Sequence, residues 1–130
     1  MRLNMLGSVL AAGLMLAGIP ALAHHSFDAE YDSTKIANMT GVVTHVDWQN
    51  PHAFIFMNVK DESGATKSVR VELGPPYALI RGGWKKDTVK TGDTVTVSGG
   101  ALGKDPTLNW VGAVNSTKLI LSNGQQMILR

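Results

Sequence analysis

The residues best able to do chemistry are histidines at two places in the sequence. His24 and His25 directly follow Ala23, and His52 ends the run Trp48-Gln49-Asn50-Pro51-His52. Imidazole nitrogens are common metal ligands, and nitrogen donors in a tetragonal arrangement suit Cu(II). The 130-residue chain has no cysteine, so disulfides, thiolate metal sites and cysteine catalysis are excluded. A nitrogen-rich metal site is therefore the first hypothesis.

Residues 1–23 have the pattern of a cleaved signal peptide. Arg2 gives a positive start, residues 5–19 are almost wholly apolar or small, and Pro20-Ala21-Leu22-Ala23 ends in an A-x-A cleavage pattern. The apolar run is shorter than the about 20 residues that a membrane span needs. We therefore expect export to the periplasm, cleavage after Ala23, and no membrane association of the mature chain.

Cleavage would make His24 the first residue of the mature protein. Its α-amine and its ring could then chelate one metal ion together, and His25 or His52 would add a further imidazole. This arrangement resembles the histidine brace of exported copper proteins, and copper is the one cofactor that the sequence suggests. The alternative is that His24 and His25 are simply solvated residues at a chain end.

A second hypothesis is a metal-free interaction module. Trp48, Asn50, Phe54 and Trp84 would form an aromatic face that binds a peptide, a glycan or another small ligand. The formal net charge of +2 comes with scattered lysines, so a nucleic-acid partner is not expected. The expected partner is a protein or a small molecule of unknown identity.

Motifs of common enzyme classes are absent from the sequence. There is no Gly-x-Ser-x-Gly elbow, no His-Glu-x-x-His, no phosphate-binding loop and no dinucleotide fingerprint. Asp47, Glu72 and Asp93 are expected to be ordinary strand-end and turn residues, and His45 an exposed strand residue. The sequence favours a binding protein over an enzyme, and a copper oxidase or monooxygenase is the enzymatic alternative.

The elements that would position these residues follow from the apolar periodicity. The length allows one domain, with an extended arm over residues 24–40 and a folded body over 41–130. Alternation predicts a hairpin over 41–60 with its bend at 49–51, then strands at 67–73, 94–98, within 108–120, and at 126–129. The segment 76–81 starts at a proline and is followed by two glycines, so it predicts a short helix with Tyr77, Leu79 and Ile80 as its contact face.

This order of elements predicts a mainly β fold. We expect a small five- to six-stranded antiparallel barrel like the oligonucleotide/oligosaccharide-binding (OB) fold, with one short helix between the third and fourth strands. Within it, Met57 is expected to fill the core. Such barrels bind very different ligands, so the fold alone does not identify a function.

Several motifs together resemble a known family. They are His24-His25-Ser26-Phe27, Trp48-Gln49-Asn50-Pro51-His52-Ala53, Glu72-Leu73-Gly74-Pro75-Pro76, Arg81-Gly82-Gly83-Trp84 and Gly92-Asp93-Thr94-Val95-Thr96-Val97. The chain is similar, over nearly the whole mature part, to small exported bacterial proteins that are known as a domain of unknown function. The resemblance implies export and a small β domain, and it implies no activity.

Overall fold

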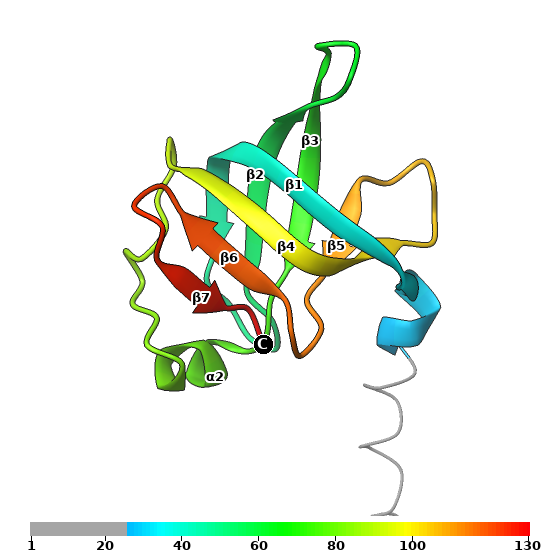
Figure 1. The fold of residues 1–130 in the computed structure, drawn as a ribbon. Coiled ribbons are helices and arrows are strands. Elements are labelled where there is room, and N and C mark those ends of the chain that lie inside the picture. Colours follow the sequence, from blue (N-terminus) through cyan, green and yellow to red (C-terminus); the bar gives the residue numbers. More distant parts are fainter. Residues whose placement is uncertain (1–25) are drawn as a thin grey trace, which may run out of the picture.

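The structure, a computed structural model, describes residues 26–130. The expected signal peptide and the two histidines that follow it lie outside the described residues. A helical turn over residues 26–30 leads into seven strands and one short helix (Figure 1). In chain order they are β1 (Tyr31–Asp47), β2 (Phe54–Lys60), β3 (Thr66–Glu72), α2 (Pro76–Arg81), β4 (Thr94–Gly103), β5 (Trp110–Gly112), β6 (Lys118–Leu121) and β7 (Gln126–Ile128).

The seven strands form one sheet in the order β1-β2-β3-β5-β4-β6-β7. Strand β1 also pairs with β4, so the pairings of β1, β2, β3, β5 and β4 make a closed circuit (Figure 1). The prediction of a mainly β fold with one helix between the third and fourth strands is confirmed, and the helix has the predicted bounds. All neighbouring strands pair antiparallel except β3 and β5, which run parallel. The prediction of a wholly antiparallel sheet was therefore wrong for this pair.

The predicted count of five to six strands was wrong. The segment over 108–120, expected as one interrupted strand, contains β5 and β6, which both pair with β4. Strand β4 can pair with both β5 and β6 because it does not end at Gly99-Gly100 but continues to Gly103. Gly99 has a φ of 81°, a conformation that glycine adopts without strain. A Cβ on Gly100 would lie 2.6 Å from Val111 Cγ1, so glycine here lets β4 continue past β5.

Strand β1 runs without interruption from Tyr31 to Asp47, and the expected boundary between arm and body at residue 41 falls inside it. Its first part pairs with β4 and its last part with β2, so it must bend over the core (Figure 1). A Cβ on Gly41 would lie 2.6 Å from Asn58 O, and the pairing register shifts between Val43 and His45. Glycine and a bulge together allow this bend.

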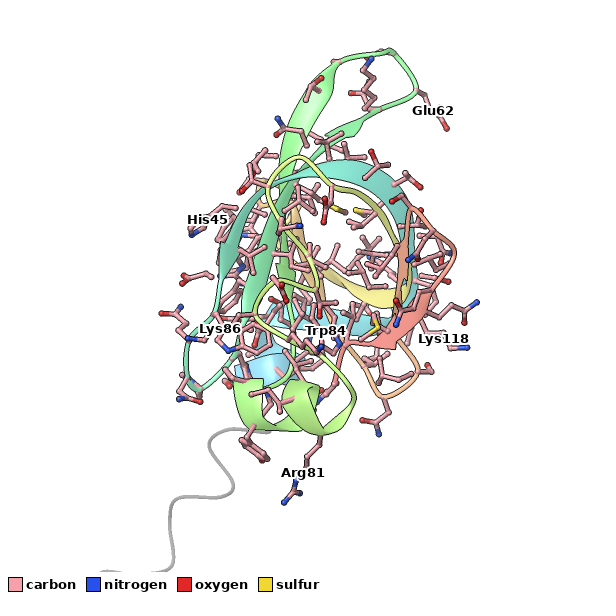
Figure 2. All side chains as sticks on the ribbon, turned by 90° about the vertical axis from the view of Figure 1, so that its left-hand side faces the viewer. His45, Glu62, Arg81, Trp84, Lys86 and Lys118 are labelled. Carbon is pink, nitrogen blue, oxygen red and sulfur yellow. The ribbon has the colours of Figure 1, made fainter. Side chains whose placement is uncertain are left out.

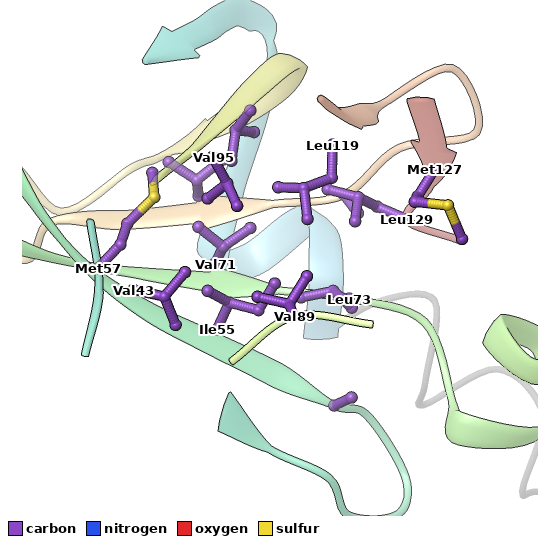
Figure 3. Packing of buried hydrophobic residues seen from close by; sticks show 14 of the residues in the cluster. Val43, Ile55, Met57, Val71, Leu73, Val89, Val95, Leu119, Met127 and Leu129 are labelled. Carbon is purple, nitrogen blue, oxygen red and sulfur yellow. The ribbon is translucent and has the colours of Figure 1, made fainter. Parts of the chain in front are cut away.

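Alternate residues of the strands fill the core (Figure 3). Ile55 and Met57 of β2 are 0% exposed, which confirms Met57 as a core residue, whereas Phe54 and Phe56 face outward and are half-buried. The predicted contact face of the helix was wrong in part, because Leu79 is buried but Tyr77 and Ile80 are 64% and 57% exposed. Within residues 26–130, no helix has the length and apolar character needed to cross a membrane.

Candidate functional site

His52 is held by a carboxylate at the entrance to β2. Its Nδ1 lies 2.5 Å from Glu72 Oε1, and the His52 side chain is 37% exposed while that of Glu72 is 12% exposed. The loop is fixed to the end of β3 because Ala53 N donates to Gly74 O and Leu73 N donates to Ala53 O. The bend predicted at 49–51 is confirmed and contains a cis Asn50–Pro51 peptide bond.

Glu72 belongs to a longer chain of polar contacts. Tyr31 OH donates to Glu72 Oε2 over 2.7 Å, and Arg70 Nη2 donates to Tyr31 OH over 2.9 Å. We refer to Tyr31, His52, Arg70 and Glu72 as the polar network. Burial, followed by the hydrogen bond to Glu72, raises the pKa of Tyr31 above its ordinary value, so the phenol stays protonated and donates to the carboxylate.

Arg70 connects the polar network to aromatic side chains on the outer face of the sheet. Its guanidinium carbon lies 3.5 Å from the centre of the Trp110 ring and 5.1 Å from that of Phe54. Arg70 is paired in register with Trp110, and Nη2 also lies 3.9 Å from carboxylate oxygens of Glu30 and Glu72. Its buried Nε makes no hydrogen bond within the described residues, so stacking and the Nη2 contacts hold the guanidinium in place.

The His52–Glu72 contact determines which ring nitrogen can react. When the ring is neutral and Glu72 is charged, the shared proton sits on Nδ1 and the lone pair is on Nε2. A carboxylate that holds one nitrogen of an imidazole in this way orients the ring and makes the other nitrogen a better metal ligand. In residues 26–130, no three or more His, Cys, Asp or Glu side chains are grouped to hold a metal. The described part therefore offers one oriented imidazole, and further ligands would have to come from elsewhere.

The helical turn over 26–30 packs close to the polar network. The Phe27 ring lies 4.7 Å from the Tyr31 ring, centre to centre, and a Cβ on Gly112 would meet both rings at 2.7–2.9 Å. Gly112 is the register partner of Glu72, so its missing side chain lets this turn approach the end of β3. The chain thus enters the described structure beside the carboxylate that holds His52.

The comparisons with known proteins identify a family. A family model described as "Family of unknown function (DUF6152)" matches residues 12–106. The chain belongs to this family. The matched range includes the whole polar network, and the match agrees with the resemblance to a family without an assigned function. No curated protein and no solved structure matches the chain.

The predicted aromatic face is divided in the structure. Trp48 and Trp84 lie together, with ring centres 6.3 Å apart, but Trp84 is 3% exposed and its Nε1 donates to Ile128 O over 2.9 Å. Figure 2 shows Trp84 between α2 and the body of the sheet. Asn50 is exposed, and Phe54 is half-buried below Arg70. Asn50 is therefore exposed at the bend, and Trp48 is half-buried against the core beside it. Trp84 belongs to the core, and Phe54 contacts Arg70.

His52 was singled out in the sequence, but the residues of the polar network that hold it in the structure were not. Glu72 was expected to be an ordinary strand-end residue, and its contact with His52 corrects that expectation. Tyr31 and Arg70 were not among the predicted site residues, although Arg70 and Glu72, two residues apart in a predicted strand, share one face of that strand. That shared face was the one available signal. His45, as expected, is exposed (Figure 2), and its ring centre lies 5.8 Å from that of Phe56.

Proposed function

We propose that this protein is an exported periplasmic binding protein for Cu(II). His52 supplies Nε2 as one ligand, and His24, as the first residue of the mature chain, supplies its amine and its ring, with His25 as the alternate imidazole. The observation that carries this proposal is the 2.5 Å contact between His52 Nδ1 and Glu72 Oε1, which engages one ring nitrogen and leaves Nε2 as the nitrogen that would bind a metal. Nitrogen ligands without any thiolate suit Cu(II).

The path of the chain also supports the proposal. His24 precedes Ser26 by two residues, and an extended chain covers at most about 3.6 Å per residue. Ser26 begins the helical turn whose Phe27 packs on Tyr31, and Tyr31 donates to the carboxylate that holds His52. A mature amino terminus at residue 24 would therefore start within a short reach of the polar network.

The fold to which we assign this site is a small OB-like barrel. The support is the closed circuit of pairings among β1, β2, β3, β5 and β4, with α2 between β3 and β4. In this arrangement β6 and β7 extend the circuit beyond β4 and cover an edge of the sheet. Rigid strands then hold both Glu72 and the segment that carries His52, as a preorganised ligand requires.

The test is a calorimetric Cu(II) titration of mature protein that begins at His24. We expect His52→Ala to weaken binding at least tenfold, and Glu72→Gln to weaken it about 10- to 100-fold, as is typical when a carboxylate behind a histidine ligand is lost. One extra glycine before His24 should weaken binding strongly, because it converts the amine into an amide. His45→Ala is the matched control and should bind like the unaltered protein, because His45 lies outside the polar network.

Equal Cu(II) affinity of the His52→Ala and His45→Ala proteins would contradict the role of His52. Equal affinity with and without the extra glycine would contradict chelation by the amine. If both results were obtained, the metal-free alternative would remain, with a peptide, glycan or small ligand bound near Trp48 and Asn50. The structure offers less for that alternative, because Trp84 is buried and the ring of Phe54 contacts the guanidinium of Arg70.

A further inference from the structure

A second concave region lies at the opposite end of β3 and β5 from Glu72. It is a pocket of about 280 Å³ between β1, β3, the end of β4, and the loop that joins β4 to β5. This volume is close to the lower limit of small-molecule sites, about 300 Å³. None of the four polar-network residues lines it, although Trp110, which stacks on Arg70, is one of its lining residues.

The wall of this pocket is apolar. Seven apolar residues from four strands and one loop line it: Met39, Val69, Leu102, Pro106, Leu108, Trp110 and Val111. Val69 and Val111 are 2% and 1% exposed and belong to the core, so the pocket reaches down to core residues. A ligand seated there would cover apolar surface that is otherwise open to water.

The rim of the pocket is cationic. Lys35, Lys67 and Lys104 line it together with one carboxylate, that of Asp105. Asp105 Oδ1 accepts hydrogen bonds from Thr107 N and Oγ1, and the side-chain bond is the main reason that the pKa of Asp105 is lowered. This carboxylate is thus engaged within its own loop.

The three ammonium groups keep donors for a ligand. Lys35 Nζ has Asp32 at 3.8 Å, and Lys104 Nζ donates to the backbone oxygen of Asp28. Each lysine ammonium has three donors, so one such contact leaves the others available. We call this region the lysine-rimmed pocket.

We propose that the lysine-rimmed pocket binds a single-chain amphiphile with a carboxylate head, such as a medium-chain fatty acid. The apolar wall takes the tail, and the lysines at the rim take the carboxylate. A group the size of a water molecule fills about 30 Å³, so a pocket of about 280 Å³ holds roughly nine such groups. This is about the number of carbon groups in a medium-length alkyl chain. A cationic head would be repelled by the rim, and a neutral head would gain nothing from it.

The experiment is calorimetry of octanoate, 1-octanol and octylammonium with the full mature protein, in low-salt buffer containing EDTA so that metal binding plays no part. We expect octanoate to bind at least tenfold more tightly than octylammonium, with octanol between them. Lys67→Met should weaken octanoate two- to fivefold, as is usual for one exposed charge pair, and should leave octanol unchanged. Lys118→Met is the control, since Lys118 is exposed on β6 and does not line the pocket (Figure 2).

A second variant tests the apolar wall without altering the core. Leu108 is 39% exposed, so Leu108→Asp should fold, and its new charge should abolish octanoate binding. Equal affinities for the three probes would overturn the proposal, as would equal effects of Lys67→Met and Lys118→Met. Absence of octanoate binding would overturn it as well, and none of these results would affect the copper titration.

Discussion

The two ends of the parallel strands β3 and β5 carry opposite kinds of surface. At their carboxyl ends, Glu72 and Gly112 lie beside His52 and Tyr31, and the polar groups bond to one another. At their amino ends, Lys67 of β3 helps to rim a pocket with an apolar wall. One end is held by hydrogen bonds among its own polar side chains, and the other has an open apolar wall and cations that keep donors for a ligand.

This difference shows how one small sheet can support two separate kinds of binding. A metal ligand must be oriented before the metal arrives, and the hydrogen bonds of the polar network provide this orientation. An amphiphile needs apolar area and charge of one sign, with much weaker demands on geometry. We therefore expect substitutions in the polar network to affect stability and the lysine substitutions to affect mainly ligand binding.

The largest effect is expected for Tyr31, which is 2% exposed. Tyr31→Ala removes a buried ring and should lower the free energy of unfolding by about 3–5 kcal/mol. Tyr31→Phe keeps the ring and removes only the hydroxyl that joins Arg70 to Glu72, so it should cost about 1–3 kcal/mol. Urea unfolding measures both. Equal losses would mean that the hydroxyl, and not the ring, accounts for the stability.

Glu72→Gln tests the carboxylate at the centre of the network. It should lower the free energy of unfolding by about 1–3 kcal/mol, because a charge-assisted contact to His52 is weakened. The control is Glu62→Gln at the exposed tip of the β2–β3 hairpin (Figure 2), where a change within about 0.5 kcal/mol is expected. A similar result for the two variants would contradict a structural role for the network.

The pH dependence at the alkaline side follows from Tyr31. Its folded-state pKa is raised, so its contribution to stability is complete below the ordinary value near 10 and is lost as pH rises through the folded-state pKa. In Tyr77→Phe protein, Tyr31 is the one remaining tyrosine. Its phenolate absorbance should appear only above pH 10, together with loss of folded structure by circular dichroism. Ionisation at the ordinary value in folded protein would contradict the buried hydrogen bond to Glu72.

The smallest effect on stability is expected at the lysine-rimmed pocket. Lys35 is 69% exposed at its side chain, and Lys67 is also exposed, so the double variant Lys35→Met with Lys67→Met should change the free energy of unfolding by no more than about 0.5 kcal/mol. Urea unfolding measures the stability of this variant, and octanoate calorimetry measures its ligand affinity. A large loss of stability would show that these cations support the fold and are not held ready for a ligand.

Much of the fold was predictable because local signals specify it. Alternation with Val69 and Val71 facing inward located β3, and Pro76 with two glycines after Arg81 located α2. The continuation of β4 past Gly99 was not predictable, since glycine there ends a strand as readily as it bends one. The strand count was wrong for that reason.

The candidate site was predictable only at His52, which stands out after Pro51 at a bend. Glu72 is 20 residues from His52 and 41 residues from Tyr31, so only the pairing of β2 with β3 and the packing of β1 bring them together. The lysines of the pocket come from three separate elements and look scattered in the sequence. Contacts that depend on register between distant strands leave no local pattern to read.

The most direct test of the central claim is the protonation of the His52 ring, measured by nitrogen-15 NMR in metal-free mature protein at a pH where the ring is neutral. The account predicts the form with the proton on Nδ1, bonded to Glu72, and the lone pair on Nε2. In Glu72→Gln protein this preference should weaken. A proton on Nε2 in the unaltered protein would contradict the claim that Glu72 prepares His52 as a metal ligand.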